Sequence, residues 1–176
     1  MPATQLLRRL GVFIIEEFIS ADECESLCSE MRLADTTEAK VLTQSLNLEC
    51  IEKRIRQTQY CQISATSNKN INERLNELRP QLEVFFGNAL ASDFEKAKFL
   101  KYDPGDFFAP HTDAQYRRKI NITINLNTSI NATGEVNFEG GELQLYGLIK
   151  KPEFTNKGIS APSTAGCLIA YPCMRR

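Results

Sequence analysis

Between Ile120 and Asn127 the sequence alternates without interruption between apolar and polar residues. This pattern predicts a strand, since neighbouring side chains of a strand point to opposite faces. Its apolar face would carry Ile120, Ile122, Ile124 and Leu126. Its polar face would carry Asn121, Thr123, Asn125 and Asn127. An apolar sheet face has to be buried under a second layer, so any fold of this chain needs a sheet that is covered on one side.

The first half of the chain supplies helices for that second layer. A β-branched and aromatic segment at 11–19 predicts a strand, and Ser20 with Glu23 forms the pattern of a capping box, so a helix is expected from Ala21. Its apolar stripe is Cys24, Leu27, Cys28 and Met31. Two thiols one turn apart also fit a metal or redox pair, but no second pair has matching spacing, and burial in the core is the favoured interpretation.

Later segments complete an α+β pattern in which helices come first and short strands follow. Residues 35–67 have weak periodicity and are predicted to be rich in loops, with short alternating pieces around 55–63. Helical spacing returns over 71–85, where Pro80 should either kink the helix or begin a second one and Gly87 is the expected C-cap. Further strands are predicted at 98–102, 142–146 and 166–171.

Size and charge limit the classes of protein to consider. A chain of 176 residues fits one structural domain, and a net charge of −1 provides no overall field for nucleic acid or an anionic membrane. Six Cys are too few for a disulfide scaffold, no secretory leader is recognisable, and no apolar run reaches the length of a membrane span. These features predict a cytoplasmic protein without nucleic-acid or membrane partners.

His111 and Asp113 form the densest chemical signal in the sequence, and His111 is the single His of the chain. In an extended segment, residues two apart point to the same side, so imidazole and carboxylate would converge. Together they form part of the ligand set of non-heme Fe(II) oxygenases, which a second His completes. The pattern by itself is weak, because a surface hydrogen-bonded pair is the commoner origin of such spacing.

The longer segment Phe99 to Asp113 (FLKYDPGDFFAPHTD) resembles the Fe(II)/2-oxoglutarate-dependent dioxygenases, specifically their prolyl 4-hydroxylase-like branch. The resemblance continues through Arg118 and the alternating strand, the FEGGEL segment at 138–143, and the segments 162–166 and 168–172. It covers most of residues 96–173. A division into an N-terminal support region (1–95) and a jelly-roll core (96–176) within one structural domain follows from it.

The resemblance implies a double-stranded β-helix, or jelly roll, with N-terminal helices packed on one sheet. It implies that His111 and Asp113 bind Fe(II) and that Tyr102 meets the far carboxylate of the co-substrate 2-oxoglutarate. Thr123 and Asn125 correspond to positions that line the co-substrate pocket, although hydrogen bonding within the sheet is an equal explanation for Asn125. The implied reaction uses O2 to couple decarboxylation of 2-oxoglutarate to substrate hydroxylation, with ascorbate as an optional further cofactor.

The chain departs from the family pattern at its C-terminal end. The second His ligand and the basic residue that binds the far carboxylate have no counterpart, so the jelly roll is expected to lack its last two strands and the chain to be truncated. Replacement of the ligand by Cys173, Glu142 or Tyr171 has no positive support, and Arg117, Arg118 and Lys119 are better explained as a solvated run than as an anion site. Activity of the chain is therefore doubtful.

Two alternatives remain open at this stage: a non-catalytic binding module with the same fold, and an unrelated β protein in which His111 and Asp113 are structural. The substrate, whether peptidyl or a small molecule, cannot be deduced, because it is selected by variable loops, here 35–68 and 128–138.

Overall fold

The computed structural model describes residues 3–43, 48–91, 95–112, 118–130 and 134–173. It combines three α-helices with small antiparallel sheets, which agrees with the predicted α+β class. The chain folds into two compact units, which are treated separately below. The first unit takes in residues 1–28, 78–90 and 112–176, and the second takes in 29–77 and 91–111. The expected division at residues 95 and 96 remains a prediction.

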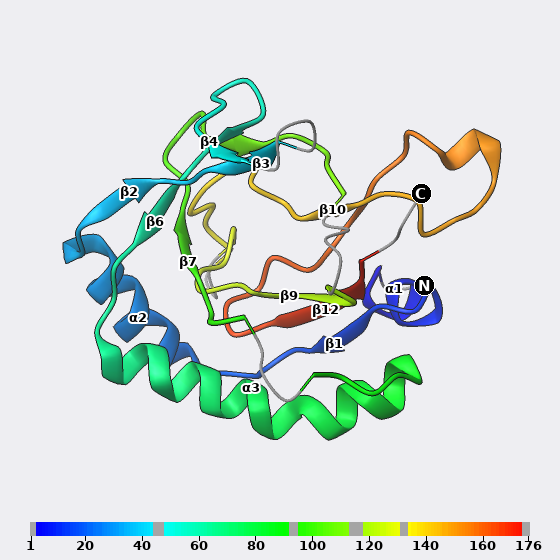
Figure 1. Cartoon of the computed structure of the whole chain (residues 1–176), viewed down its shortest axis with the longest axis horizontal. Helices are drawn as coiled ribbons and strands as arrows, with labels where there is room; N and C mark the ends of the chain where they lie inside the picture. The colour runs from blue at the N-terminus through cyan, green and yellow to red at the C-terminus, as the bar shows by residue number, and fades with distance from the viewer. Residues whose placement is uncertain (1–2, 44–47, 92–94, 113–117, 131–133, 174–176) are drawn as a thin grey trace. The chain divides into compact units, whose positions relative to one another are not determined.

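The central sheet of the first unit has three strands in the order β1 (Phe13–Ile15), β12 (Leu168–Pro172) and β9 (Ile120–Ile124). Both pairings are antiparallel, and Figure 1 shows β12 lying between its two neighbours. The alternating segment is thus a strand, although it ends at Ile124 and not at Asn127. The strand predicted at 11–19 is shorter than expected, since turns follow Ile15.

Cross-strand pairing determines which residues share a face of this sheet. Ile169 pairs with Ile14 on one side and with Thr123 on the other, so the polar positions of β9 share a face with Ile169. A buried apolar cluster covers this face. It consists of Leu7, Val12, Ile14, Leu145, Ala161, Cys167 and Ile169.

The apolar positions of β9 share the opposite face with Phe13, because Ile122 pairs with Ala170 and Ala170 pairs with Phe13. The end of helix α3 (Ala65–Phe86) lies against this face, with the Phe85 and Phe13 rings 5.1 Å apart in an edge-to-face arrangement. The expectation that a helix covers the apolar face is therefore confirmed at this contact.

Four short elements of the first unit were not predicted or are shorter than predicted. Helix α1 (Ala3–Arg9), which contributes Leu7 to the apolar cluster, was not anticipated from the sequence. Strand β10 (Gln144–Leu145) pairs with β11 (Ile159–Ser160), and the 3-10 helix η1 (Pro152–Phe154) lies between them in sequence. These elements bury few side chains of their own, which is why their periodicity is faint.

Helix α2 (Ala21–Leu33) begins where the capping box predicts. The Ser20 amide donates to the Glu23 carboxylate (2.8 Å), and the Glu23 amide donates to the Ser20 hydroxyl (3.2 Å). The thiols of Cys24 and Cys28 approach the carbonyl oxygens of Asn125 (4.0 Å) and Leu126 (3.4 Å). Cys24 is buried, in agreement with its assignment to the core.

Helix α3 is one helix of 22 residues with Pro80 inside it. A second helix that starts at Pro80 is not observed, so that alternative is wrong, whereas the helical spacing over 71–85 lies within α3 as predicted. Tertiary burial of Ile71, Leu75, Leu78 and Leu82 outweighs the one backbone hydrogen bond that proline removes. Gly87 ends the helix as expected, at a φ of 64°, and the Asn88 amide donates to the Glu83 carbonyl (3.3 Å).

The second unit contains the segment that was expected to be rich in loops. Instead that segment holds five short strands, β2 to β6, and with β7 and β8 they pair in the orders β2–β6–β7, β3–β4 and β5–β8. Their bounds are β2 (Thr36–Glu38), β3 (Val41–Thr43), β4 (Leu48–Cys50), β5 (Arg56–Gln57), β6 (Gln59–Cys61), β7 (Phe99–Lys101) and β8 (Phe107–Phe108). Strands of two or three residues are too short to produce recognisable alternation, so the prediction failed here.

Among the described residues, no helix is both long enough and apolar enough to cross a membrane.

Candidate metal and co-substrate site

His111 lies in the second unit, three residues after β8, and is exposed. Its ring stacks on Phe108, with the centroids 3.6 Å apart and 18° between the planes. Its Nδ1 lies 2.9 Å from the Ala109 carbonyl oxygen. A carbonyl can only accept, so Nδ1 carries the proton when the imidazole is neutral, and the lone pair is on Nε2. This is the arrangement in which metal-binding imidazoles are commonly held.

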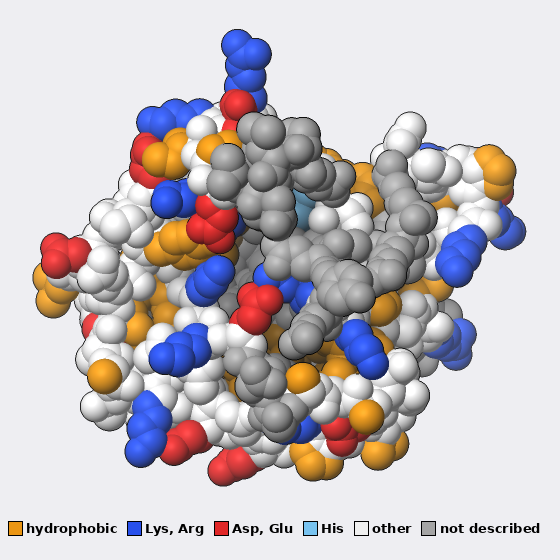
Figure 2. Space-filling model, in the orientation of Figure 1, with side chains coloured by type: hydrophobic (Ala, Val, Ile, Leu, Met, Phe, Trp, Pro, Cys, Tyr) orange, Lys and Arg blue, Asp and Glu red, His pale blue; other side chains and the backbone are white. Residues whose placement is uncertain are grey.

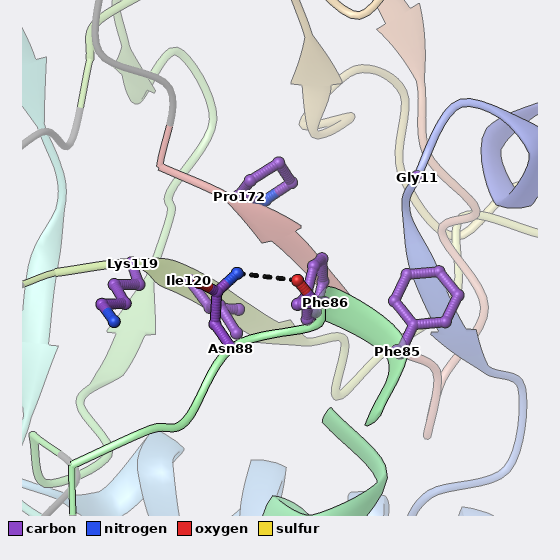
Figure 3. A pocket seen from close by; sticks show the side chains of 7 residues that line it. All are labelled: Gly11, Phe85, Phe86, Asn88, Lys119, Ile120 and Pro172. Carbon is purple, nitrogen blue, oxygen red and sulfur yellow. Dashed lines mark hydrogen bonds between the residues drawn. The ribbon is translucent and has the colours of Figure 1, made fainter. Parts of the chain in front are cut away.

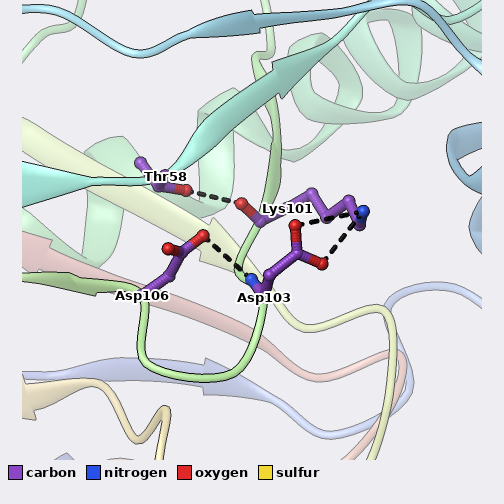
Figure 4. Close-up of polar contacts among 4 residues, drawn as sticks. All are labelled: Thr58, Lys101, Asp103 and Asp106. Atoms are coloured by element: carbon purple, nitrogen blue, oxygen red, sulfur yellow. Dashed lines mark hydrogen bonds and ion pairs between the residues drawn. The ribbon is translucent and has the colours of Figure 1, made fainter.

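A tight turn at 103–106 joins β7 to β8, the strands that Tyr102 and His111 follow in sequence (Figure 4). The Asp106 amide donates to the Asp103 carbonyl (2.8 Å), and the Asp103 amide donates to the Asp106 carboxylate (2.9 Å). Gly105 has a φ of 91°, as the third residue of a type II turn with proline in second place requires. Lys101 pairs with Asp103 at 3.0 Å, and this hydrogen bond is the main reason why the pKa of Lys101 is raised.

Tyr102 directly follows β7, and 46% of the residue is exposed. Desolvation of its hydroxyl is nevertheless the largest influence on its pKa and raises it above the ordinary value of 10.0. The charge of Arg56 and a hydrogen bond with Thr58 act in the opposite direction. Thr58 is itself buried, and its hydroxyl donates to the Lys101 carbonyl (2.7 Å).

Arg56 is a buried cation, 8% exposed, directly opposite Phe108 in the β5–β8 pair. Its guanidinium carbon lies 4.5 Å from the centroid of the Phe108 ring and 5.2 Å from that of Tyr60. Nη1 donates to the Tyr60 hydroxyl (3.2 Å) and to the Lys40 carbonyl (3.4 Å). Phe108 therefore contacts both Arg56 and His111.

The other predicted site residues are Asn125, Asp113 and the basic run at 117–119. Asn125 belongs to the first unit, where its side-chain amide donates to the carbonyl of Pro162 (2.7 Å), which lies in the loop between β11 and β12 and not in the sheet. Its role toward a co-substrate stays a prediction. Asp113 and Arg117 lie outside the described residues. Lys119 donates to the Ala89 carbonyl (3.4 Å).

A second candidate is a cavity of about 360 Å³ in the first unit (Figure 3). Its lining residues are Gly11, Phe85, Phe86, Asn88, Lys119, Ile120 and Pro172. Among the described residues that line it there is no carboxylate, imidazole or thiol, the groups that most often bind a metal. The surroundings of His111 are therefore the better candidate for chemistry.

The residues present can be compared with the metal and co-substrate that the resemblance implies. The His111 tautomer suits a metal, and the Arg56 and Tyr102 donors suit a carboxylate. Across the ranges that the structure describes, no three groups of His, Cys, Asp or Glu are gathered to hold a metal ion. Cys173 and Glu142 are part of those ranges, as is Tyr171. Figure 2 shows cationic and anionic side chains interspersed over the visible face.

Comparison with known proteins reveals a similar fold among solved structures. No family model matches the sequence, and no curated protein matches it significantly. Among solved structures, a Pseudomonas putida prolyl-4-hydroxylase superposes with a TM-score of 0.66 over 97% of this chain and 85% of the other. The two chains share a fold. At 22% identity the likeness extends to the fold alone, and it supports the helix-and-sheet arrangement expected from the sequence.

Sequence reasoning overlooked Arg56 as part of the site. The signal was present, because Arg56, Thr58 and Tyr60 are two residues apart and would lie on one face of an extended segment. This segment was interpreted as loop with short alternating pieces, so its polar members were not compared with Tyr102. Phe108 was likewise treated only as part of the family pattern, and not as the ring that joins Arg56 to His111.

Proposed function

We propose that this protein is an Fe(II)- and 2-oxoglutarate-dependent dioxygenase of the prolyl 4-hydroxylase-like branch, and that its sheets form a jelly roll. His111 and Asp113 would hold the metal, and Tyr102 and Asn125 would hold the co-substrate. The observation that carries the proposal is the fold shared with a prolyl-4-hydroxylase over 97% of the chain. The sequence motif around His111 adds independent support.

The protein's own groups would contribute binding and orientation. The Ala109 carbonyl fixes the His111 proton on Nδ1, so the lone pair that would bind a metal is on Nε2. Stacking on Phe108 restrains the ring. The bound iron would supply the oxidation chemistry with O2, and the acceptor would be a peptidyl group or a small molecule.

A second candidate function is ligand binding without turnover. The whole chain contains one His, so each copy can offer only one imidazole to a metal. The 2-His-1-carboxylate set of this enzyme class needs two. This observation favours a chain that binds metal and co-substrate but oxidises little or no substrate.

Calorimetry with Mn(II), a stand-in for Fe(II) that does not react with O2, tests the binding part of the proposal. The wild type should bind Mn(II), and should bind 2-oxoglutarate more tightly once Mn(II) is present. His111→Ala should weaken Mn(II) binding at least about tenfold, since a direct ligand is lost. Asp22→Asn removes an exposed acid at the start of α2 and serves as the control. Equal Mn(II) affinity in His111→Ala and wild type would contradict the proposed site.

Release of succinate from 2-oxoglutarate, with Fe(II) and O2 supplied, separates the two candidate functions. Little or no succinate alongside clear Mn(II) and 2-oxoglutarate binding would favour the binding module. Rapid succinate release that depends on His111 would establish the dioxygenase, and would show that one imidazole per chain suffices.

A further inference from the structure

Arg56 has more hydrogen-bonding capacity than its surroundings use. A guanidinium carries five N–H donors. In the described part of the chain, both of its hydrogen bonds to protein come from Nη1. Nε is buried and has no partner. A buried donor without an acceptor is unfavourable, so its presence calls for an explanation in terms of function or of a missing ligand.

A purely structural role accounts for only part of this arrangement. Contacts with the Phe108 and Tyr60 rings explain how the cation is tolerated in a mostly enclosed position. They use the face of the guanidinium and leave the N–H groups along its edge unused. An anion in the plane of the guanidinium would satisfy those groups, because carboxylates match the spacing of two guanidinium N–H donors.

Arg56 is linked to His111 and to Tyr102, the two residues of this unit that the proposed function places in the site. The centroid of the Phe108 ring lies 4.5 Å from the guanidinium carbon of Arg56 and 3.6 Å from the centroid of the His111 ring. The charge of Arg56 also acts on the hydroxyl of Tyr102. Arg56 and His111 are therefore both neighbours of the same aromatic ring. Tyr102 is 46% exposed, so the cluster borders solvent.

We propose that Arg56, together with the hydroxyl of Tyr102, binds the far carboxylate of 2-oxoglutarate. This inference rests on the proposed function and adds a residue to it. The family pattern places the basic partner of this carboxylate on a strand late in the chain, whereas Arg56 lies on β5, well before His111. Binding the carboxylate would also offset the cost of burying an incompletely bonded cation.

A pair of 2-oxo acids isolates this one contact. 2-Oxoglutarate and 2-oxovalerate have the same keto acid end and chain length, but the latter has a methyl group in place of the far carboxylate. Affinities for both acids are measured by calorimetry in the presence of Mn(II), for the wild type, Arg56→Gln and Tyr102→Phe. Arg54→Gln, which changes an exposed arginine two residues away, is the matched control.

The wild type and Arg54→Gln should prefer 2-oxoglutarate by about tenfold or more, as a charge-assisted contact predicts. Arg56→Gln should reduce this preference to about twofold or less while 2-oxovalerate binding is retained. Tyr102→Phe should reduce it partially. Circular dichroism checks folding, and if Arg56→Gln does not fold, Arg56→Lys takes its place: it keeps the charge but loses the two-donor geometry, and should reduce the preference severalfold.

The outcomes separate this inference from the proposed function. If the wild type binds both acids equally, or if Arg56→Gln weakens both to the same extent, Arg56 does not bind the far carboxylate, although the proposed function stands. If Arg56→Lys and Tyr102→Phe each keep the wild-type preference for 2-oxoglutarate over 2-oxovalerate, Arg56 likewise does not bind the far carboxylate. If the wild type binds neither Mn(II) nor either acid, the proposed function fails and this inference fails with it.

Discussion

At the scale of single residues, the hydroxyl of Thr58 links two neighbours of the candidate site. It donates to the Lys101 carbonyl and lowers the pKa of Tyr102. Thr58→Val replaces this hydroxyl with a methyl group of similar shape. The pKa of Tyr102 should therefore rise further above its ordinary value of 10.0, because desolvation then acts with less opposition. Titration of tyrosine absorbance with pH measures this change.

The chain contains five Tyr, so the titration of Tyr102 has to be separated from the others. Subtracting the curve of Tyr102→Phe from that of each protein achieves this. Thr58→Ser keeps the hydroxyl and should leave the pKa of Tyr102 close to that of the wild type. A lower pKa in Thr58→Val would mean that the hydroxyl does not stabilise the ionised phenol.

At the scale of secondary-structure elements, Gly166 joins the start of β12 to the segment before α2. Its carbonyl accepts from the Phe18 amide (2.9 Å), and its own amide donates to the Asn125 carbonyl (2.8 Å). Its φ is 79°, and an added Cβ would overlap the Ile19 carbonyl oxygen. Gly166→Ala should therefore lower the free energy of unfolding by about 3 kcal/mol or more, as measured by urea denaturation.

Gly87→Ala provides the matched control for this substitution. Gly87 also has a positive φ, of 64°, but nothing lies within 4 Å of an added Cβ. Only the backbone penalty applies there, and the cost should be about 1 kcal/mol. Equal losses of unfolding free energy in the two variants would show that the residues around Gly166 move at little cost to accommodate the added methyl group.

At the scale of the whole molecule, buried thiols should determine how stability responds to alkali. Desolvation raises the pKa of Cys24, Cys61 and Cys167 above the ordinary value of 9.0. The folded chain therefore keeps these protons to higher pH than the unfolded chain. Their contribution to stability is intact below pH 9.0 and falls as the pH rises from there toward the folded-state pKa, by at most about 1.4 kcal/mol per pH unit for each thiol.

Urea denaturation at a series of pH values between about 7.5 and 10 measures this loss. Cys167→Ala should reduce the steepness of the decline whatever its effect at neutral pH, because one fully enclosed thiol no longer has to ionise. Cys50→Ala changes a thiol that is only partly buried and is the comparison. A decline of the same steepness in Cys167→Ala and wild type would assign the alkaline response to other groups.

Local sequence signals predicted the elements whose causes are local. The capping box placed the start of α2, Gly87 placed the end of α3, and the turn at 103–106 formed where Pro104 and Gly105 require it. Strands β9 and β12 were recognisable because each is long enough to show its pattern. The five short strands between residues 36 and 61, β2 to β6, were missed, because they are defined by their pairing partners and not by their own periodicity.

The sequence by itself thus determined the α+β class, the two-faced strand and the candidate residues His111 and Tyr102, because periodicity, caps and motif order are properties of neighbouring residues. Tertiary structure alone decided that α3 continues through Pro80 and that Phe108 contacts both Arg56 and His111. The side chains of Arg56 and Phe108 are 52 positions apart and meet only through the β5–β8 pairing, a long-range contact that no local pattern encodes.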